Sequence, residues 1–392
     1  MFSSRTRWHR EPNRLARQLA EARHTGRPII DLTLSNPTLA GLRYPEQEIR
    51  EALISGDILT YTPHPRGLIA ARIAVAGYYG DRGIQLDPEN VLLTAGSSEA
   101  YSFVFRLLCE PGDTILVPSP SYPLFDYLAD VNDVRVASYR LEYGGEWHID
   151  TESIRRAATP GSRAIVIVHP NNPTGTFLKT SELEWIAAFA SERDMAVIVD
   201  EVFIDYPLGR DERRARSTAA FPETLTFTIN GLSKTAGLPQ MKLGWLAVSG
   251  PHEKVCESLE RLDIVADTYL SVNTPAQHAL PRLLQLGEGI RESIRTRTRR
   301  NLDLLGGRVA ETPPCSLLSV EGGWYATVRV PTTRSEEEWA LRLLDEAGVY
   351  LHPGFFFDFR GGGHLVMSLL NPEEEFVEGT ARAMWVIEQG GI

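Results

Sequence analysis

Short apolar runs that alternate with helical stretches constrain the fold of this chain more than any other feature. The stretches between the runs, such as residues 181–194, carry helical patterns. Short runs rich in β-branched residues are typical of strands that are covered on both faces. The alternation predicts an α/β fold in which a mostly parallel sheet lies between layers of helices. The runs interpreted as buried strands are VLLT (91–94), TILV (114–117), AIVIV (164–168), AVIV (196–199), LTFTI (225–229) and GWLAV (244–248).

Chain length and a change of pattern predict a second domain. The 392 residues exceed one ordinary hydrophobic core. After about Pro275 a long charged helix over 286–305 leads to isolated strand-like segments. We therefore predict a large domain over 45–275 and a smaller α+β domain built from 1–44 and 276–392.

Composition excludes several classes of function. The net charge of −11 offers no basic surface for nucleic acid or for an anionic membrane, and the longest apolar runs are too short to span a bilayer. The Arg-rich N-terminus contains acidic residues and is interpreted as part of the fold rather than a transit peptide. The cysteines Cys109, Cys256 and Cys315 are widely spaced, which predicts a reducing, cytoplasmic location and gives no metal site.

Polar residues follow several of the predicted strands. Ligands of open α/β sheets collect beyond the carboxyl ends of the strands. After 91–94 comes AGSSEA, a small-residue turn that opens a helix, with Ser97 and Ser98 near its start. Free backbone N–H groups and the helix dipole at such a position favour a phosphate, although ordinary helix capping alone would also explain these residues.

Three further strand ends carry an amide, a carboxylate and an amine. Asn172 lies in HPNNPTG after 164–168, Asp200 ends the next run, and Lys234 follows 225–229. A plain turn and a helix cap are the alternatives for Asn172 and Asp200. A carboxylate beyond a buried strand is costly unless it meets a positive partner.

One ligand requires all four groups, namely pyridoxal 5′-phosphate. Its phosphate suits a helix N-terminus, and its aldehyde forms a Schiff base with a lysine. A carboxylate keeps its pyridine nitrogen protonated, and an amide can hold its phenolate oxygen. The sequence therefore predicts a pyridoxal-phosphate site at this edge of the sheet.

Seven motifs carry a family resemblance from about Asp31 to the C-terminus. In this order and spacing they resemble the class I/II aminotransferases, the fold-type I group of pyridoxal-phosphate enzymes. The resemblance implies that fold, a large cofactor domain with a smaller domain, and transaminase activity. The motifs are SNP (35–37), YTPHPRG (61–67), TAGSSEA (94–100), PSPSYPLF (118–125), PNNPTG (170–175), DEVF (200–203) and GLSKTAGLPQMKLGW (231–245).

The resemblance also implies a role for individual residues. Lys234 would form the Schiff base and carry the proton, Asp200 would pair with the pyridinium, and Asn172 would bond the phenolate oxygen. Tyr122 would stack on the cofactor ring. Tyr61 would reach the phosphate of the neighbouring subunit, which implies a homodimer. The phosphate contacts within one subunit would come from Gly96, Ser97, Ser98 and Ser233.

Two departures from the family pattern concern the cofactor. Lys242 stands where the family usually has a phosphate-binding arginine, so it would act as a point charge without the bidentate fork. Phe203 stands where a tyrosine commonly helps Asn172, and the missing hydroxyl should loosen the cofactor somewhat. The other two lysines, Lys179 and Lys254, are interpreted as solvated surface residues.

A third departure concerns the substrate. Val366 occupies the position of the arginine that usually clamps the substrate carboxylate. Three explanations stay open: a shifted alignment, another basic group, or a substrate without a conventionally placed carboxylate. Arg360 and Arg66 are candidate replacements, with a surface arginine as the alternative for each, and Asn36 is a further candidate substrate contact.

The leading hypothesis is a transaminase that moves an amino group between an amino acid, or a related amine, and a 2-oxo acid. Val366 raises the alternative of a pyridoxal-phosphate-dependent lyase or decarboxylase. A cofactor-binding regulatory or scaffold protein is a third possibility, against which an intact Lys234, Asp200 and Asn172 argue. The sequence contains no GxGxxG after a strand, no GxxxxGK[ST], no GxSxG and no HExxH.

Overall fold

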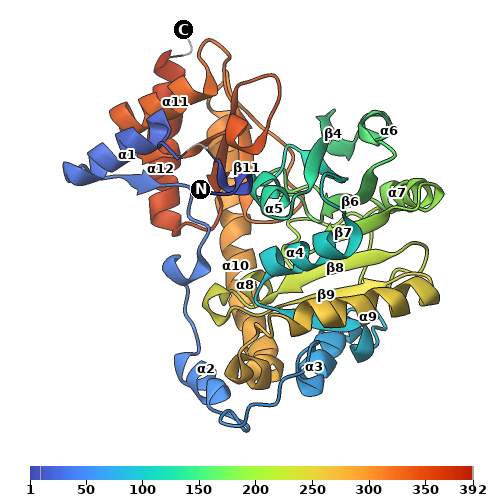
Figure 1. Cartoon of the computed structure of the whole chain (residues 1–392). Coiled ribbons are helices and arrows are strands. Elements are labelled where there is room, and N and C mark those ends of the chain that lie inside the picture. Colours follow the sequence, from blue (N-terminus) through green and yellow to red (C-terminus); the bar gives the residue numbers. More distant parts are fainter. Residues whose placement is uncertain (9, 391–392) are drawn as a thin grey trace.

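The computed structural model describes residues 1–8 and 10–390 (Figure 1). An eight-stranded sheet forms the larger part, in the spatial order β2-β9-β8-β7-β6-β3-β4-β5. The five neighbouring strands β8, β7, β6, β3 and β4 are parallel, whereas β9 and β5 run antiparallel to their neighbours. The strands are β2 (Val91–Thr94), β3 (Thr114–Ser119), β4 (Arg135–Tyr143), β5 (Trp147–Ile149), β6 (Ser162–Val168), β7 (Ala196–Asp200), β8 (Thr226–Gly231) and β9 (Gly244–Ser249).

The mostly parallel sheet confirms the predicted fold class, and all six predicted strands form. The outer pair, β4 and β5, was not predicted from the sequence. Residues along β4 are mostly exposed or half-buried, with Tyr139 and Leu141 the buried exceptions. A strand at the sheet edge needs no continuous apolar run, so the pattern that revealed the central strands is absent there.

Helices cover both faces of the sheet because successive side chains of each strand point to opposite sides. Ile198 packs into a cluster with α4 (Ser97–Leu108), α5 (Phe125–Val131) and α9 (His252–Asp267). Its neighbour Val199 packs on the other face, in a cluster with α6 (Thr151–Ala157) and α7 (Thr180–Glu192). At the β2 end this second face is covered by α3 (Ile69–Gly80). Burial of each large aliphatic side chain contributes roughly 1.5–3 kcal/mol.

A smaller part contains a four-stranded antiparallel sheet in the order β10-β11-β14-β13. The N-terminal segment joins this part, since β1 pairs with β12 and α1 packs against α11. The arrangement confirms the predicted smaller α+β unit. Its elements are α1 (Arg14–His24), β1 (Ile30–Asp31), β10 (Ser316–Leu317), β11 (Tyr325–Arg329), α11 (Glu336–Arg342), β12 (Val349–Tyr350), β13 (His352–Pro353), β14 (His364–Ser368) and α12 (Glu373–Gly390).

The long helix α10 (Thr274–Ala310) links the two parts. Figure 1 shows it running beside the sheet, and it contacts α2 (Glu46–Leu53), α3 and α12. The side chain of Asn273 caps it by accepting the Ala276 N–H at 2.9 Å. We propose that the domain boundary lies near residue 275, where this helix begins. Within the described residues, none of the helices has both the length and the apolar character needed to cross a bilayer.

Candidate active site

A cavity of about 510 Å³ lies at the carboxyl ends of β2, β6, β7 and β8. Parallel strands β6, β7 and β8 bring their ends to one edge, and β2 joins them beyond the antiparallel β9. The structure thereby gathers predicted site residues that are up to 146 positions apart, from Gly96 to Lys242. The predicted site residues that line the cavity are Gly96, Ser97, Ser98, Tyr122, Asn172, Asp200, Phe203, Ser233, Lys234 and Lys242.

Four predicted residues do not line this cavity. Tyr61 is 72% exposed and borders a separate surface pocket. Arg66 forms two 2.6 Å hydrogen bonds with the Asp263 carboxylate. Arg360 is exposed, and Asn36 caps a short turn by accepting the Thr38 N–H at 3.0 Å.

The start of α4 forms an anion-binding position. The helix begins at Ser97, and its N-cap residue is Gly96. Because glycine has no side chain, the cap residue itself leaves the first backbone N–H groups of the helix available to a ligand. Gly96 has φ 154°, which favours glycine, and a Cβ built on it would lie 3.7 Å from Nζ of Lys242. Backbone donors, the positive end of the helix dipole and an ammonium group therefore meet at one point. This combination fits a phosphate group.

Asp200 ends β7 with its carboxylate in the cavity. Burial raises its pKa to about 6. Two hydrogen bonds to the carboxylate oppose that shift, one from the Val202 N–H at 3.0 Å and one from the Tyr101 hydroxyl at 3.1 Å. The nearby charge of Lys234 opposes it as well. These contacts fix the carboxylate in orientation and favour its ionised form.

Lys234 lies in α8 (Leu232–Thr235), directly after β8. Burial lowers the pKa of its amine to about 8, and the charge of Asp200 acts in the opposite direction. Nζ lies 4.6 Å from the centre of the Trp324 ring and 5.3 Å from that of Phe203. The Tyr206 hydroxyl donates to the Lys234 carbonyl oxygen. The amine is thus held between rings and can lose its proton close to neutral pH.

Asn172 and Tyr122 complete the wall of the cavity. Asn172 is 9% exposed, and within the described part of the chain its Oδ1 has no hydrogen-bond partner. An amide turned by 180° presents its donor in place of its acceptor, so this group is free to bond a ligand. Tyr122 is 48% exposed at the mouth. Its loop is held by the Ser121 N–H, which donates to the Phe357 carbonyl at 3.0 Å.

The substrate side of the cavity has an unusual composition. Among the described residues, no arginine lines it. Val366 is 1% exposed on β14 and packs in an apolar cluster with Phe357 and Phe359. The hydroxyl-bearing Ser35 and Tyr325 do line the cavity, and their side chains are within hydrogen-bonding reach of each other.

The interpretation of Lys179 as a surface residue is wrong. Its side chain is 10% exposed and its Nζ lies 2.6 and 2.7 Å from the two carboxylate oxygens of Glu321. Lys254 is 52% exposed and pairs with Asp194, as expected for a surface lysine. Tyr325, which lines the cavity, and Trp324, beside Lys234, were not predicted from the sequence. The double glycine directly before Trp324 indicates a close backbone approach, but it does not say to what.

Comparisons with known proteins identify a family and related structures that resemble this chain. The family model for "Aminotransferase class I and II" matches residues 27–375. The glutamate-pyruvate aminotransferase AlaA of Escherichia coli K12 is 27% identical over 346 residues, which cover 86% of this chain and 85% of the relative. The structure of an alanine aminotransferase from Pyrococcus furiosus superimposes with a TM-score of 0.87 at 28% identity, covering 96% of both chains. The structure of a Thermus thermophilus aspartate aminotransferase double mutant superimposes with a TM-score of 0.84 at 26% identity, covering 98% of this chain and 99% of the other.

Proposed function

Because the chain belongs to the class I and II aminotransferase family and is a transaminase, we propose that its cavity holds pyridoxal 5′-phosphate on Lys234. Members of the family use this cofactor. The observation that carries the proposal is the gathering of Lys234, Asp200 and the start of α4 around one cavity. Each of these matches a different chemical group of the cofactor.

The residues present fit the cofactor group by group. The N–H groups at Gly96–Ser98, the Ser233 hydroxyl and Nζ of Lys242 would hold the phosphate. Asp200 would keep the ring nitrogen protonated, and Tyr122 would stack on the ring. Asn172 would bond the phenolate oxygen without help from Phe203, which has no hydroxyl. When bound, the cofactor supplies an electron sink that stabilises negative charge on the substrate carbon.

Lys234 would also move the proton. With a pKa near 8, a substantial fraction of the amine is neutral at physiological pH, and a neutral Nζ accepts a proton from the substrate Cα. The Trp324 and Phe203 rings restrict where Nζ can lie. Asp200 stays ionised above about pH 6 and maintains the positive charge on the ring nitrogen.

The substrates of a transaminase in this family are an amino compound and a 2-oxo acid. Which ones this chain uses depends on how the donor carboxylate is held. We propose that Ser35 and Tyr325 bond it, since they line the cavity in which no described residue supplies an arginine. Arg66 is already paired with Asp263, so it is a weaker candidate than Arg360 or Asn36. Because the apolar Val366 cannot bind a substrate carboxylate, a lyase or decarboxylase activity stays the second candidate.

A homodimer would complete the site. Tyr61 is exposed near other exposed apolar side chains, including Leu59 at 94% and Ile54 at 71%. A solvated chain seldom gathers such groups in one segment unless they are covered by a partner. Tyr61 would then reach the phosphate of the neighbouring subunit. A cytoplasmic location stays a prediction, consistent with the free cysteines Cys109, Cys256 and Cys315.

The test is a spectrum of the purified protein followed by a donor screen. We expect visible absorption that borohydride removes, with the mass label on Lys234. Alanine, glutamate and simple amines should then convert the bound cofactor to its amino form. Release of pyruvate, ammonia or carbon dioxide without that conversion would identify a lyase or decarboxylase. A colourless protein without a label on Lys234 would contradict the proposal.

A further inference from the structure

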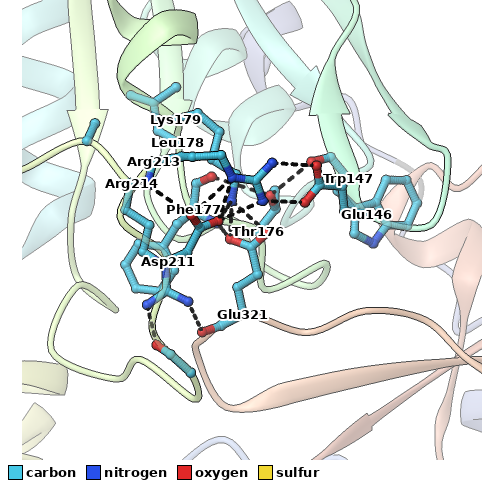
Figure 2. A network of polar contacts seen from close by, with 12 residues as sticks. Glu146, Trp147, Thr176, Phe177, Leu178, Lys179, Asp211, Arg213, Arg214 and Glu321 are labelled. Atoms are coloured by element: carbon cyan, nitrogen blue, oxygen red, sulfur yellow. Dashed lines mark hydrogen bonds and ion pairs between the residues drawn. The ribbon is translucent and has the colours of Figure 1, made fainter.

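A polar network whose centre is largely buried lies beside the active site, where the loops after β6 and β7 and the β4–β5 turn meet the segment that leads into β11. Figure 2 shows its members converging from these separate elements. At its centre the Glu321 carboxylate accepts hydrogen bonds from Nζ of Lys179, at 2.6 and 2.7 Å, and from the Phe177 N–H at 3.0 Å. Lys179 also lies 3.2 Å from the Asp211 carboxylate. The Glu321 side chain is 13% exposed, so solvent screens this ion pair only weakly.

Backbone contacts extend the attachment along residues 321–325, which we call the anchored segment. The Glu321 N–H donates to the Gly175 carbonyl at 3.2 Å, and the Glu321 carbonyl accepts the Leu208 N–H at 2.9 Å. A Cβ at Gly322 would lie 2.8 Å from the Tyr206 carbonyl oxygen and 2.4 Å from the Phe177 ring. The backbone at 322 therefore packs so closely on the larger part that only glycine fits at this position.

The anchored segment ends in two residues of the site. Trp324 is fully buried, and its ring centre lies 5.2 Å from that of Phe203 and 4.6 Å from Nζ of Lys234. Tyr325 is the next residue and lines the cavity. Tyr325 begins β11 of the smaller sheet and Trp324 directly precedes it, so the placement of Trp324 beside Lys234 depends on how that sheet is attached to the larger part.

The carboxylates of Glu146, Asp211 and Glu321 lie close enough together to hold a metal ion. However, Lys179 already bonds two of them, and Arg213 bonds Asp211 and Glu146. Two cations within the group compensate its negative charge. We therefore interpret the cluster as a set of ion pairs that joins the two parts of the chain.

We propose that Glu321 is a positioning residue of the active site: its ion pair with Lys179 fixes the anchored segment on the large part and so sets Trp324 against Nζ of Lys234. The ring excludes water from one side of the amine and restricts where Nζ can lie. Glu321 itself touches neither the cofactor position nor the cavity. The proposal rests on Lys234 being the catalytic amine.

The first test uses the cofactor-free protein, so that it does not depend on cofactor binding. Acetic anhydride acylates only neutral amines, and a chain with four lysines allows each label to be assigned by mass. The rate of labelling of Lys234 against pH gives its titration midpoint. Glu321→Gln should raise that midpoint by about half a unit or more, because a looser Trp324 admits water and relieves the burial of the amine. Glu146→Gln is the matched control, since Glu146 bonds Arg213 in the same network but does not contact the anchored segment.

The second test uses the loaded enzyme. Glu321→Gln should reduce kcat about tenfold with little change in the KM of the donor, because misplacing a catalytic group costs rate rather than binding. The double variant Glu321→Gln with Lys179→Gln replaces the ion pair by two amides that can bond each other and should recover part of the loss. Trp324→Leu breaks the contact with Lys234 directly and should shift the labelling midpoint in the same direction, even if Glu321→Gln does not fold.

Two results would overturn the proposal. One is a Glu321→Gln protein that melts earlier but keeps the Lys234 midpoint and kcat of the parent, which would make Glu321 purely structural. The other is a Trp324→Leu protein with an unchanged midpoint. A shifted midpoint in a protein that binds no pyridoxal phosphate would support the positioning role and reject the proposed cofactor instead.

Discussion

Asp200 and Lys234 line the same cavity, and the negative charge of Asp200 raises the pKa of the Lys234 amine while burial lowers it. Burial has the larger effect, so the amine titrates near pH 8 rather than near 10.5. The same burial raises the pKa of Asp200, and Lys234 opposes that shift. Because each charge favours the other, a change at either residue alters the proton affinity of both.

Replacement of the proposed catalytic amine should abolish covalent cofactor binding. In Lys234→Arg, borohydride should fix no label, and turnover should fall by about 10²–10⁴, the usual contribution of a positioned acid–base group. Lys254→Arg is the control, because Lys254 is 52% exposed and pairs only with Asp194 among the described residues. Parental turnover and a cofactor still covalently bound in Lys234→Arg would refute the role of this residue.

The capture of pyridoxal phosphate by the cofactor-free protein should depend on pH. Only the neutral amine attacks an aldehyde, so the rate should rise about tenfold per pH unit below pH 8 and level off above it. Asp200→Asn removes the charge that raises the Lys234 pKa, so the bend in the plot of capture rate against pH should move to lower pH. Stopped-flow absorbance measures this bend, and a bend near pH 10 in the parent would show that the amine is not buried as described.

The lowered pKa of Lys234 makes the stability of the folded protein depend on pH. The folded protein loses the Lys234 proton near pH 8 and the unfolded chain near pH 10.5. Between these values the unfolded state binds more protons, so this residue makes the free energy of unfolding rise with pH. In Lys234→Met that contribution should disappear. Urea unfolding of the cofactor-free parent and variant at several pH values across this interval measures the difference between their slopes.

Tyr325 should matter for donors that carry a carboxylate. If its hydroxyl bonds that group, Tyr325→Phe should lower kcat/KM for an α-amino acid about 10- to 150-fold, since a hydrogen bond to a charged group is worth about 1.5–3 kcal/mol. The corresponding amine without the carboxylate should be unaffected. An equal loss for both donors would assign Tyr325 to the cofactor or to the shape of the cavity instead.

Lys242 should hold the phosphate by charge alone. Its Nζ lies beside the start of α4, so Lys242→Gln should raise the cofactor Kd by about tenfold or more. Lys242→Arg should tighten binding where the bidentate fork reaches two phosphate oxygens. Equilibrium titration followed by absorbance gives both constants, and an unchanged Kd in Lys242→Gln would remove this residue from the phosphate site.

The sequence alone determined the central strands and the residues at their ends. Strands such as β6 are covered on both faces, so only apolar β-branched runs fit there and their pattern is legible. Parallel strands bring their carboxyl ends to one edge, so the positions of Asn172, Asp200 and Lys234 directly after three such runs are enough to group them. Motif order then identified the family.

Only the tertiary structure decided which charged residues are buried and what they contact. Lys179 has the sequence context of a surface lysine, and its partner Glu321 lies 142 positions away. The contact between Lys179 and Glu321 depends on how the segment before β11 packs against the loops of the larger part. That packing cannot be predicted from the local sequence around either residue. The same holds for Trp324 beside Lys234 and for the pairing of Arg66 with Asp263. A contact between distant residues is set by the relative placement of whole elements, which arises from the sum of many weak interactions rather than from any one motif.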